Sequence, residues 1–308
     1  MFLRLSRFLV PILAGLVLLV GVSSNAQLAQ DPVRINVDLV NVLCSVFDKR
    51  TNSFVTAMSQ NDFSIFEDGR RQEITNFTRE TDLPLTLAML VDTSYSAGPK
   101  LKFEQDAAMS FFHNVLKEND RAMLVEFNSS VKLLQDFTDD PGKLVNQVRK
   151  LRAGGDSSLF DAIDQVCDEK MIRETGRKAM IILSDGDDNG SSADYRKAVE
   201  MALRAECTIF SVSISKGGFF GTGEDTKKGD KVLRNLAKET GGKVFFPFKV
   251  EELEDAFRQI NQELRSQYSI GYFSTNSRRD GSFRKLEIKL RERNMDLNHR
   301  KGYYAPLN

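Results

Sequence analysis

Residues Leu85–Ser96 read LTLAMLVDTSYS and decide the fold. Leu85–Val91 carries almost no polar side chain, which predicts a strand buried on both faces of a mostly parallel sheet. The turn that follows contains Asp92, Ser94 and Ser96, and a glycine and a proline come next. In open α/β sheets, ligands bind just beyond the carboxyl ends of the strands. Three oxygen donors at that place predict a site for a small hard cation such as Mg²⁺.

Strands and helices alternate from residue 84 to residue 265. Further strands are expected at Arg121–Phe127, Val131–Phe137, Lys178–Ser184, Cys207–Ile214 and Lys243–Phe246, the first two forming a hairpin. Helices are expected at Leu101–Lys117, Pro141–Leu151, Leu159–Glu174, Ala193–Ala205, Asp230–Thr240 and Val250–Arg265. This rhythm predicts a doubly wound α/β fold. The intervening stretch Lys216–Gly229 is long for such a connection and is expected to be a loop.

The segments on either side of this domain change to a period of two. Residues 33–80 alternate polar and apolar side chains and contain an Asp68-Gly69 turn, typical of a hairpin between Phe63–Glu67 and Gln72–Phe77. Residues 266–308 show the same alternation but are too few for a stable core. We therefore expect both segments to form one small β-sandwich-like unit, with the α/β domain inserted in it.

The N-terminus has the layout of a secretory signal peptide. Arg4 and Arg7 precede the uncharged run Phe8–Val22, and Ser24 to Ala26 offer small residues for cleavage. Residues 1–26 are thus expected to be removed after export to the periplasm or the extracellular space, with only transient membrane contact. An uncleaved membrane anchor is the alternative, although the apolar run is short for a spanning helix.

Composition narrows the possible functions. The 308 residues include 43 Lys and Arg and 43 Asp and Glu, so no basic excess points to nucleic acid. The two histidines, His113 and His299, are far apart in sequence and do not indicate a zinc site. Cys44, Cys167 and Cys207 show no CxxC spacing, and an odd count leaves at least one free thiol in an exported protein. The last two lie in apolar segments and are expected to be buried.

Two later turns join the first at the predicted edge of the sheet. Ser157 follows a Gly-Gly pair, and Asp185 lies in a Ser-Asp-Gly turn after the strand Lys178–Ser184. With the D-x-S-x-S turn, this set resembles the von Willebrand factor A family and its metal-ion-dependent adhesion site. The family usually has threonine where Ser157 stands, and Ser158 and Asp156 are neighbouring alternatives for that ligand.

The resemblance implies a specific ligand set and function. Ser94, Ser96 and Ser157 would bind Mg²⁺ (or Mn²⁺ or Ca²⁺), while Asp92 and Asp185 would act largely through bound water. One coordination position would stay open for an Asp or Glu carboxylate of a protein partner. Few anionic ligands leave the ion electrophilic, so an acidic partner group completes its shell well. The family therefore implies a metal-dependent adhesion or protein-binding module without catalysis.

Other interpretations of the same residues remain open. Asp92, Ser96 and Asp185 could simply cap turns and helices, which would leave a structural envelope scaffold with a non-functional metal site. A phosphoryl-transfer enzyme could use Asp92 and Asp185 with metal, but only Lys100 and Lys178 offer a phosphate clamp. The chain lacks GxSxG, GxxxxGK[ST] and HExxH motifs.

An EF-hand is a further metal site to weigh. Its opening pattern starts at Asp185, but the twelfth position, which needs a bidentate glutamate, is Arg196. The EF-hand interpretation therefore fails, and Asp187 and Asp188 are expected to be loop carboxylates beside the edge.

Overall fold

The computed structural model describes residues 39–79, 83–214, 224–247, 249–292 and 294–307. The predicted signal peptide, the start of the first predicted strand segment and residues 216–223 of the Lys216–Gly229 stretch lie outside these residues. Within the described residues, no helix is both long enough and apolar enough to cross a membrane.

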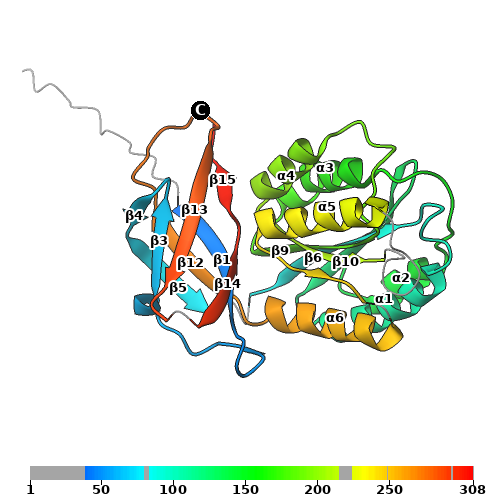
Figure 1. The fold of residues 1–308 in the computed structure, drawn as a ribbon, viewed down its shortest axis with the longest axis horizontal. Coiled ribbons are helices and arrows are strands. Elements are labelled where there is room, and N and C mark those ends of the chain that lie inside the picture. Colours follow the sequence, from blue (N-terminus) through cyan, green and yellow to red (C-terminus); the bar gives the residue numbers. More distant parts are fainter. Residues whose placement is uncertain (1–38, 80–82, 215–223, 248, 293, 308) are drawn as a thin grey trace, which may run out of the picture. The chain divides into compact units, whose positions relative to one another are not determined.

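A six-stranded sheet forms the centre of residues 83–265, called here the α/β region (Figure 1). Its order is β11-β10-β9-β6-β7-β8, and the strands are β6 (Leu85–Asp92), β7 (Arg121–Phe127), β8 (Val131–Thr138), β9 (Arg177–Ser184), β10 (Cys207–Ser213) and β11 (Val244–Phe245). All pairs are parallel except β7 with β8. Every residue of β6 and β9 is buried, as continuous apolar runs predict.

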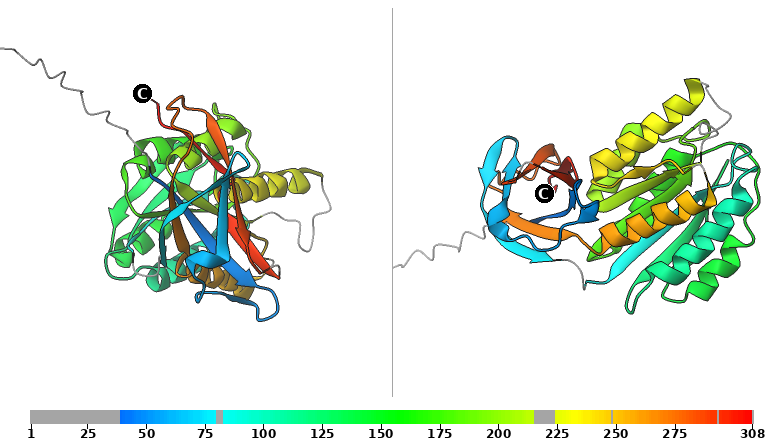
Figure 2. Two further views of the ribbon diagram at one scale, coloured as in Figure 1. Left: turned by 90° about the vertical axis from the view of Figure 1, so that its left-hand side faces the viewer. Right: turned by 60° about the horizontal axis from the view of Figure 1, so that its bottom comes forward.

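Helices cover both faces of this sheet (Figures 1 and 2). One face packs against α1 (Leu101–Val115), α2 (Pro141–Val148) and α6 (Val250–Leu264), and the other against α3 (Leu159–Glu169), α4 (Tyr195–Arg204) and α5 (Glu224–Thr240). A short 3₁₀ turn, η2 (Met171–Arg173), follows α3. Asp140 caps α2, because its Oδ1 accepts a hydrogen bond of 2.8 Å from Gly142 N.

The segments before and after the α/β region pair with each other in two antiparallel sheets, called here the β region. One sheet has the order β14-β1-β12-β5, with β2 paired to β1, and the other has the order β15-β13-β3-β4. The strands are β1 (Leu39–Asp48), β2 (Ser53–Phe54), β3 (Phe63–Glu67), β4 (Arg70–Gln72), β5 (Ile74–Arg79), β12 (Tyr268–Phe273), β13 (Phe283–Leu290), β14 (Met295–His299) and β15 (Gly302–Tyr304), with the 3₁₀ turn η1 (Gln60–Asp62) before β3. Side chains from both sheets fill one hydrophobic core.

Three local predictions were wrong. The strand that follows the Asp68-Gly69 turn and pairs with β3 is only the short β4. The predicted partner strand is mostly β5, which pairs with β12 in the other sheet. The strand β14 was not expected. The helix α5 begins at Glu224 rather than at Asp230, so the end of the predicted loop is helical. In each case tertiary pairing or packing outweighs the local pattern.

A polar group occupies the core of the β region. Glu67 is 2% exposed and accepts hydrogen bonds from Tyr272 OH (2.7 Å), Tyr303 OH (2.9 Å) and Ser274 Oγ (2.7 Å). Arg284, also buried, lies 3.5 Å from the same carboxylate. A charge this deeply buried is tolerated because its oxygens have partners.

All three cysteines are buried free thiols, as predicted for two of them. Cys44 belongs to the core of the β region, whereas Cys167 and Cys207 lie between the central sheet and its α3–α5 layer. Burial raises the pKa of the Cys44 thiol far above its usual value, so the uncharged form is strongly favoured.

Candidate metal centre

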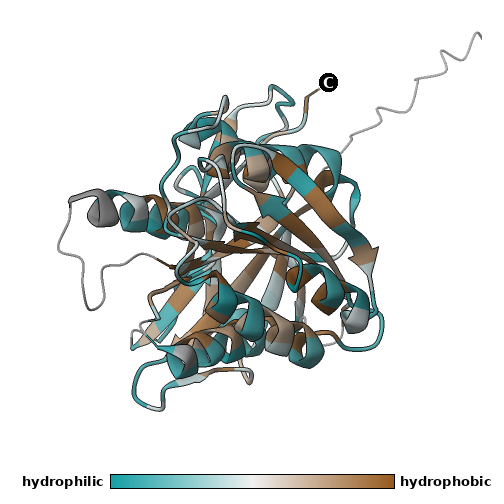
Figure 3. Cartoon of the chain, turned by 90° about the vertical axis from the view of Figure 1, so that its right-hand side faces the viewer, coloured by the Kyte–Doolittle hydropathy of each residue, from teal (hydrophilic) through white to brown (hydrophobic). Residues whose placement is uncertain are grey.

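The predicted site residues lie at the carboxyl ends of the central strands. Parallel pairing of β6 with β9 aligns Val91 with Leu183, so the next residues, Asp92 and Ser184, are neighbours at that edge. Figure 3 shows the α/β region with hydrophobic strands inside and hydrophilic surfaces on the surrounding helices. We call this edge, with the turns that follow β6 and β9 and the turn before α3, the rim.

Asp92 is the centre of the hydrogen bonds at the rim. It is fully buried, and its Oδ1 accepts a hydrogen bond of 2.9 Å from Ser94 N. Its Oδ2 accepts hydrogen bonds from Ser157 Oγ (3.1 Å) and Ser184 Oγ (2.8 Å). The hydroxyl oxygens of Ser94 and Ser96 are 3.0 Å apart. Four of the five predicted residues are thus gathered around one carboxylate.

These contacts do not fully offset the burial of Asp92. Burial raises the pKa of Asp92 to about 6, although the hydrogen bonds from Ser94 and Ser184 lower it, and the nearby charge of Asp185 raises it further. The hydrogen bonds therefore offset only part of the cost of charging Asp92. A divalent ion bound at the hydroxyls would reduce that cost further.

The turn before α3 is fixed to its neighbours by backbone hydrogen bonds. Gly154 N donates to Thr93 O (2.7 Å), and Tyr95 N donates to Gly155 O (3.0 Å). Gly155 has φ +86°, and a Cβ there would lie 2.7 Å from Ser129 Oγ, so both conformation and space require glycine. This arrangement turns the hydroxyl of Ser157 toward Asp92.

Asp185 lies at the same edge but makes no direct hydrogen bond to Asp92. Its Oδ1 accepts a hydrogen bond of 3.2 Å from Asp187 N, and the residue is half-buried. The following Gly186 has φ +82°, and a Cβ there would lie 2.2 Å from the carbonyl oxygen of Gly229. The Asp-Gly pair thus lets the chain turn sharply beneath α5 while the Asp185 carboxylate stays at the rim.

Sequence reasoning missed two residues that support the site. Ser184 binds Asp92, and Asn189 Oδ1 accepts a hydrogen bond of 2.9 Å from Ser157 N. Asp188 is a loop carboxylate, as expected, and its Oδ2 accepts hydrogen bonds from Phe160 N (2.8 Å) and Ser191 Oγ (2.6 Å). It thus satisfies a backbone N–H in the first turn of α3. Short polar residues in a loop gave no signal for these partners.

Glu104 is a third residue that the sequence pattern did not single out. It lies in the first turn of α1, is 1% exposed, and neither carboxylate oxygen has a hydrogen-bond partner. Burial raises the pKa of Glu104 to about 8, and the charges of Asp92 and Asp185 raise it too, while Lys100 lowers it. Its side chain therefore lies within electrostatic range of both rim aspartates.

The two lysines considered as phosphate clamps do not converge on Asp92. Lys100 Nζ donates a hydrogen bond of 2.8 Å to Ile214 O. Lys178 lies near the amino end of β9, at the opposite edge of the sheet, and its Nζ donates to Glu174 O at 3.1 Å. The rim therefore offers hydroxyl and carboxylate oxygens rather than a cationic cradle for a phosphate.

The donor chemistry fits a hard divalent cation. Serine hydroxyls and carboxylates are the oxygen ligands that Mg²⁺, Mn²⁺ and Ca²⁺ accept. No group of three or more His, Cys, Asp or Glu side chains in the described part of the chain is arranged to hold a metal ion. The predicted centre differs from such a group because it combines three hydroxyls with only two carboxylates.

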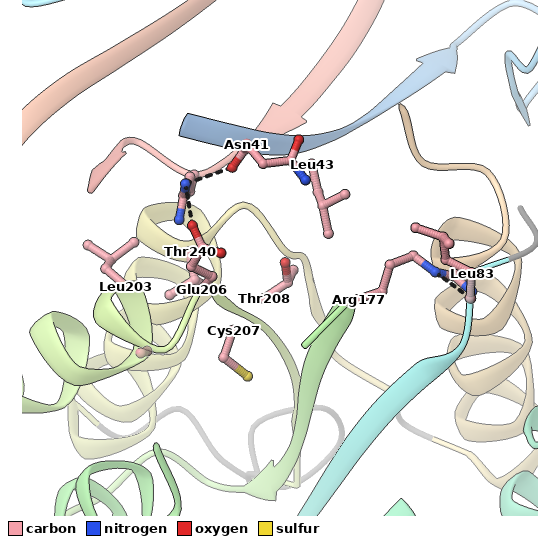
Figure 4. Close-up of a pocket in the computed structure, with 12 residues that line it drawn as sticks. Asn41, Leu43, Leu83, Arg177, Leu203, Glu206, Cys207, Thr208 and Thr240 are labelled. Atoms are coloured by element: carbon pink, nitrogen blue, oxygen red, sulfur yellow. Dashed lines mark hydrogen bonds and ion pairs between the residues drawn. The ribbon is translucent and has the colours of Figure 1, made fainter. Parts of the chain in front are cut away.

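A separate cavity of about 140 Å³ opens at the other end of the strands (Figure 4). Arg177, Cys207 and Thr208, which line it, belong to the amino-terminal parts of β9 and β10. The Arg177 side chain donates a hydrogen bond of 2.9 Å to Leu83 O. None of the predicted metal ligands lines this cavity.

Comparisons with known proteins place the chain in a family. A search of curated proteins gives no match. Three similar solved structures are a von Willebrand factor type A protein from Catenulispora acidiphila, proximal thread matrix protein 1 from the mussel byssus, and the von Willebrand factor domain of the pilus tip protein Mfa5 from Porphyromonas gingivalis.

The three similarities differ in extent. The first has 13% identity and a TM-score of 0.50, over 82% of this chain and 76% of that one. The second has 13% identity and a TM-score of 0.51, over 65% and 51%. The third has 15% identity and a TM-score of 0.44, over 58% and 94%.

The sequence itself gives the family directly. The model of the von Willebrand factor type A domain matches residues 86–263, which is more than half of the chain. This range holds the whole rim and nearly all of the α/β region. The chain belongs to the von Willebrand factor type A domain family, whose members are mostly non-enzymatic interaction modules that often bind a metal.

Proposed function

We propose that this protein is an exported, metal-dependent protein-binding module. Asp92, Ser94, Ser96, Ser157 and Asp185 would hold Mg²⁺, or Mn²⁺ or Ca²⁺ in its place. When bound, the ion offers a Lewis-acidic position to an Asp or Glu carboxylate of a protein partner. Catalysis is not part of the proposal, because Lys178 lies at the opposite edge of the sheet and Lys100 donates to a backbone carbonyl.

One observation carries this proposal. The carboxylate of Asp92 is fully buried and is surrounded by hydroxyls that come from separate turns of the chain. A residue that only caps a helix satisfies its own local backbone, as Asp140 does, whereas Asp92 also accepts hydrogen bonds from the side chains of Ser157 and Ser184. Convergence on Asp92 is what a small cation with oxygen ligands requires.

The chain's own residues have distinct roles in this arrangement. Ser94, Ser96 and Ser157 would supply direct hydroxyl ligands. Asp92 would hold Ser94 and Ser157 in place through the hydrogen bonds it accepts from them. The Asp185 carboxylate adds negative charge at the rim and makes no direct hydrogen bond to Asp92. Tyr95, which is 76% exposed between the two serines, offers an aromatic contact to a partner next to the open position.

Metal titration tests the proposal. Mg²⁺ and Mn²⁺ are titrated calorimetrically into EDTA-treated protein that starts at Gln27, beside Asp92→Ala and Ser96→Ala variants. We expect saturable one-site binding in the wild type and its loss in both variants. Asp140→Asn is the matched control: it also removes one carboxylate, but it keeps a good helix cap and lies beyond the far end of β8.

Two results would overturn the proposal. One is the absence of saturable binding in folded wild-type protein, which would favour a structural scaffold with a non-functional site. The other is equal binding by wild type and folded Asp92→Ala. Circular dichroism of each variant without metal shows whether it is folded.

We also propose that residues 84–265 form a domain inserted in a β-sandwich-like unit built from residues 33–80 and 266–308. Mutual pairing of β1 with β12 and β14 supports this organisation. Limited proteolysis should then release both end segments together, and residues 84–265 expressed alone should be less stable than the whole.

The export proposal rests on residues 1–26, and the N-terminal sequence of the secreted protein tests it.

A further inference from the structure

We propose that Glu104 balances the charge of a divalent cation at the rim and strengthens its binding without being a direct ligand. This inference rests on the metal site proposed above and adds a residue to it from α1. It makes Glu104 a positioning residue for the ion, acting through the electric field at Asp92 and Asp185.

The position of Glu104 in the chain supports this role. The helix α1 begins shortly after the D-x-S-x-S turn, and Glu104 N donates a hydrogen bond of 3.0 Å to Lys100 O in its first turn. A glutamate in the first turn of a helix is commonly exposed to solvent, where it complements the helix dipole. Here the side chain points inward and is buried.

The surroundings of Glu104 do not explain why a carboxylate is buried there. Neither oxygen has a hydrogen-bond partner among the residues that the structure describes. The helix α1 packs with buried hydrophobic side chains of α2, α6 and the central sheet. A residue chosen only for packing at this place would be apolar, because an unpaired buried carboxylate destabilises the fold.

The charge balance supplies a reason. The start of α1 lies at the rim, because Lys100 Nζ donates to Ile214 O and Ile214 N donates to the backbone oxygen of Ser184, whose hydroxyl donates to Asp92. The negative charges of Asp92 and Asp185 act on the Glu104 carboxyl there, and Lys100 is the cation among the described residues that acts on it. A bound divalent ion would offset the remaining negative charge. Because the region is largely shielded from water, the interaction of Glu104 with such an ion is stronger than it would be at the surface.

The experiment compares Mg²⁺ affinity and metal-free stability in Glu104→Gln and Glu104→Met. The first variant keeps shape and polarity, and the second keeps approximate volume and helix propensity without a polar group. Calorimetry should show Mg²⁺ binding weakened about tenfold or more in both variants. In EDTA, their thermal midpoints should equal or exceed that of the wild type, since neither loses a hydrogen bond.

Asp106→Asn is the matched control. Asp106 lies on the same helix, but its side chain is exposed and pairs with Lys102. Removing its charge should leave Mg²⁺ affinity within about twofold of the wild type, because solvent screens exposed charges. A tenfold loss here would show that the effect reflects net charge rather than the place of Glu104, and would contradict the inference.

Each remaining outcome is also decisive. Wild-type affinity in either folded Glu104 variant overturns the inference but leaves the metal site standing. Failure of both variants to fold would mean that Glu104 holds the structure through a partner, which also overturns it. No Mg²⁺ binding in the wild type would overturn the metal site itself, and this is recognised before any Glu104 variant is measured.

Discussion

Two glutamates are buried to the same degree in different regions of the molecule. Glu67 in the β region is 2% exposed, and Glu104 in the α/β region is 1% exposed. Three hydroxyls and an arginine surround the carboxylate of Glu67. Among the residues that the structure describes, none forms a hydrogen bond with the carboxylate of Glu104. Burial alone therefore does not reveal what a buried charge is for, whereas its hydrogen bonds do.

The difference in hydrogen bonding between Glu67 and Glu104 suggests different roles for the two carboxylates. A satisfied carboxylate such as Glu67 belongs to the finished fold, because removing it leaves its donors without an acceptor. An unsatisfied carboxylate such as Glu104 has no such role in the metal-free fold, and in our proposal it serves the cation bound at the rim. Glu67 therefore has the contacts of a structural residue, and Glu104 has those expected of a residue that supports the proposed metal site.

The strongest test of this contrast is the Glu67→Ala substitution. It removes the acceptor of the Tyr272 and Tyr303 hydroxyls and the carboxylate beside the buried guanidinium of Arg284, so the free energy of unfolding should fall by about 3–5 kcal/mol. Urea denaturation measures the loss, with Glu104→Gln as the comparison that should lose nothing. A loss below about 1 kcal/mol for Glu67→Ala would remove the distinction between the two glutamates.

A second test uses pH. His299 in β14 is buried, its Nε2 accepts a hydrogen bond of 3.3 Å from Ile288 N, and its Nδ1 lies 2.7 Å from Arg300 O. Burial and the charge of Lys301 lower the pKa of His299 to about 4. The unfolded chain therefore takes up a proton first, near its ordinary pKa of about 6.5.

The sign follows from linkage. The neutral, buried His299 contributes about 3 kcal/mol to the free energy of unfolding. This contribution is fully present above pH 6.5 and is lost as the pH falls toward 4. The rim should behave oppositely, because the raised pKa of Asp92 favours the protonated folded state as the pH falls through 6. Urea denaturation from pH 7 to pH 4 should show a steeper loss for wild type than for His299→Gln. Parallel curves would contradict this assignment.

The smallest effect is expected for Ser184→Ala. Ser184 donates to Asp92 and accepts a hydrogen bond of 3.0 Å from Gly186 N, so its loss should cost about 1 kcal/mol in EDTA. This is well below the effect of Glu67→Ala, because the other partners of Asp92 remain. Chemical denaturation in EDTA measures it. A loss as large as that of Glu67→Ala would mean that the rim, too, is primarily a structural network.

The sequence predicted the central sheet and most of the rim because their signals are local. The apolar runs that became β6 and β9 and the turns after them carry their meaning in a few adjacent residues. The α/β order of strands and helices follows from the same periodicity. Ser157 was named among three neighbours, and its hydroxyl is the one that donates to Asp92.

Residues whose role depends on distant partners were missed. Glu104 looks like a surface position in the helical pattern, and only packing against the sheet makes it buried. Asn189 acts through a backbone group 32 positions earlier in the chain. The strand β14 has only five residues, too few for its alternation to be recognised in the sequence. Its partner β1 lies near the other end of the chain, so only the folded structure shows their pairing.

The labelling rates of the three buried thiols can report how often each region opens. A thiol-reactive reagent can modify Cys44 only when the β region opens, and Cys167 or Cys207 only when the α/β region does, since each is 2% exposed or less. Under native conditions the labelling rates therefore report the opening free energies of the two regions separately. Equal rates at Cys44 and Cys167 would mean that both regions open in one cooperative step, and unequal rates would show which of them yields first.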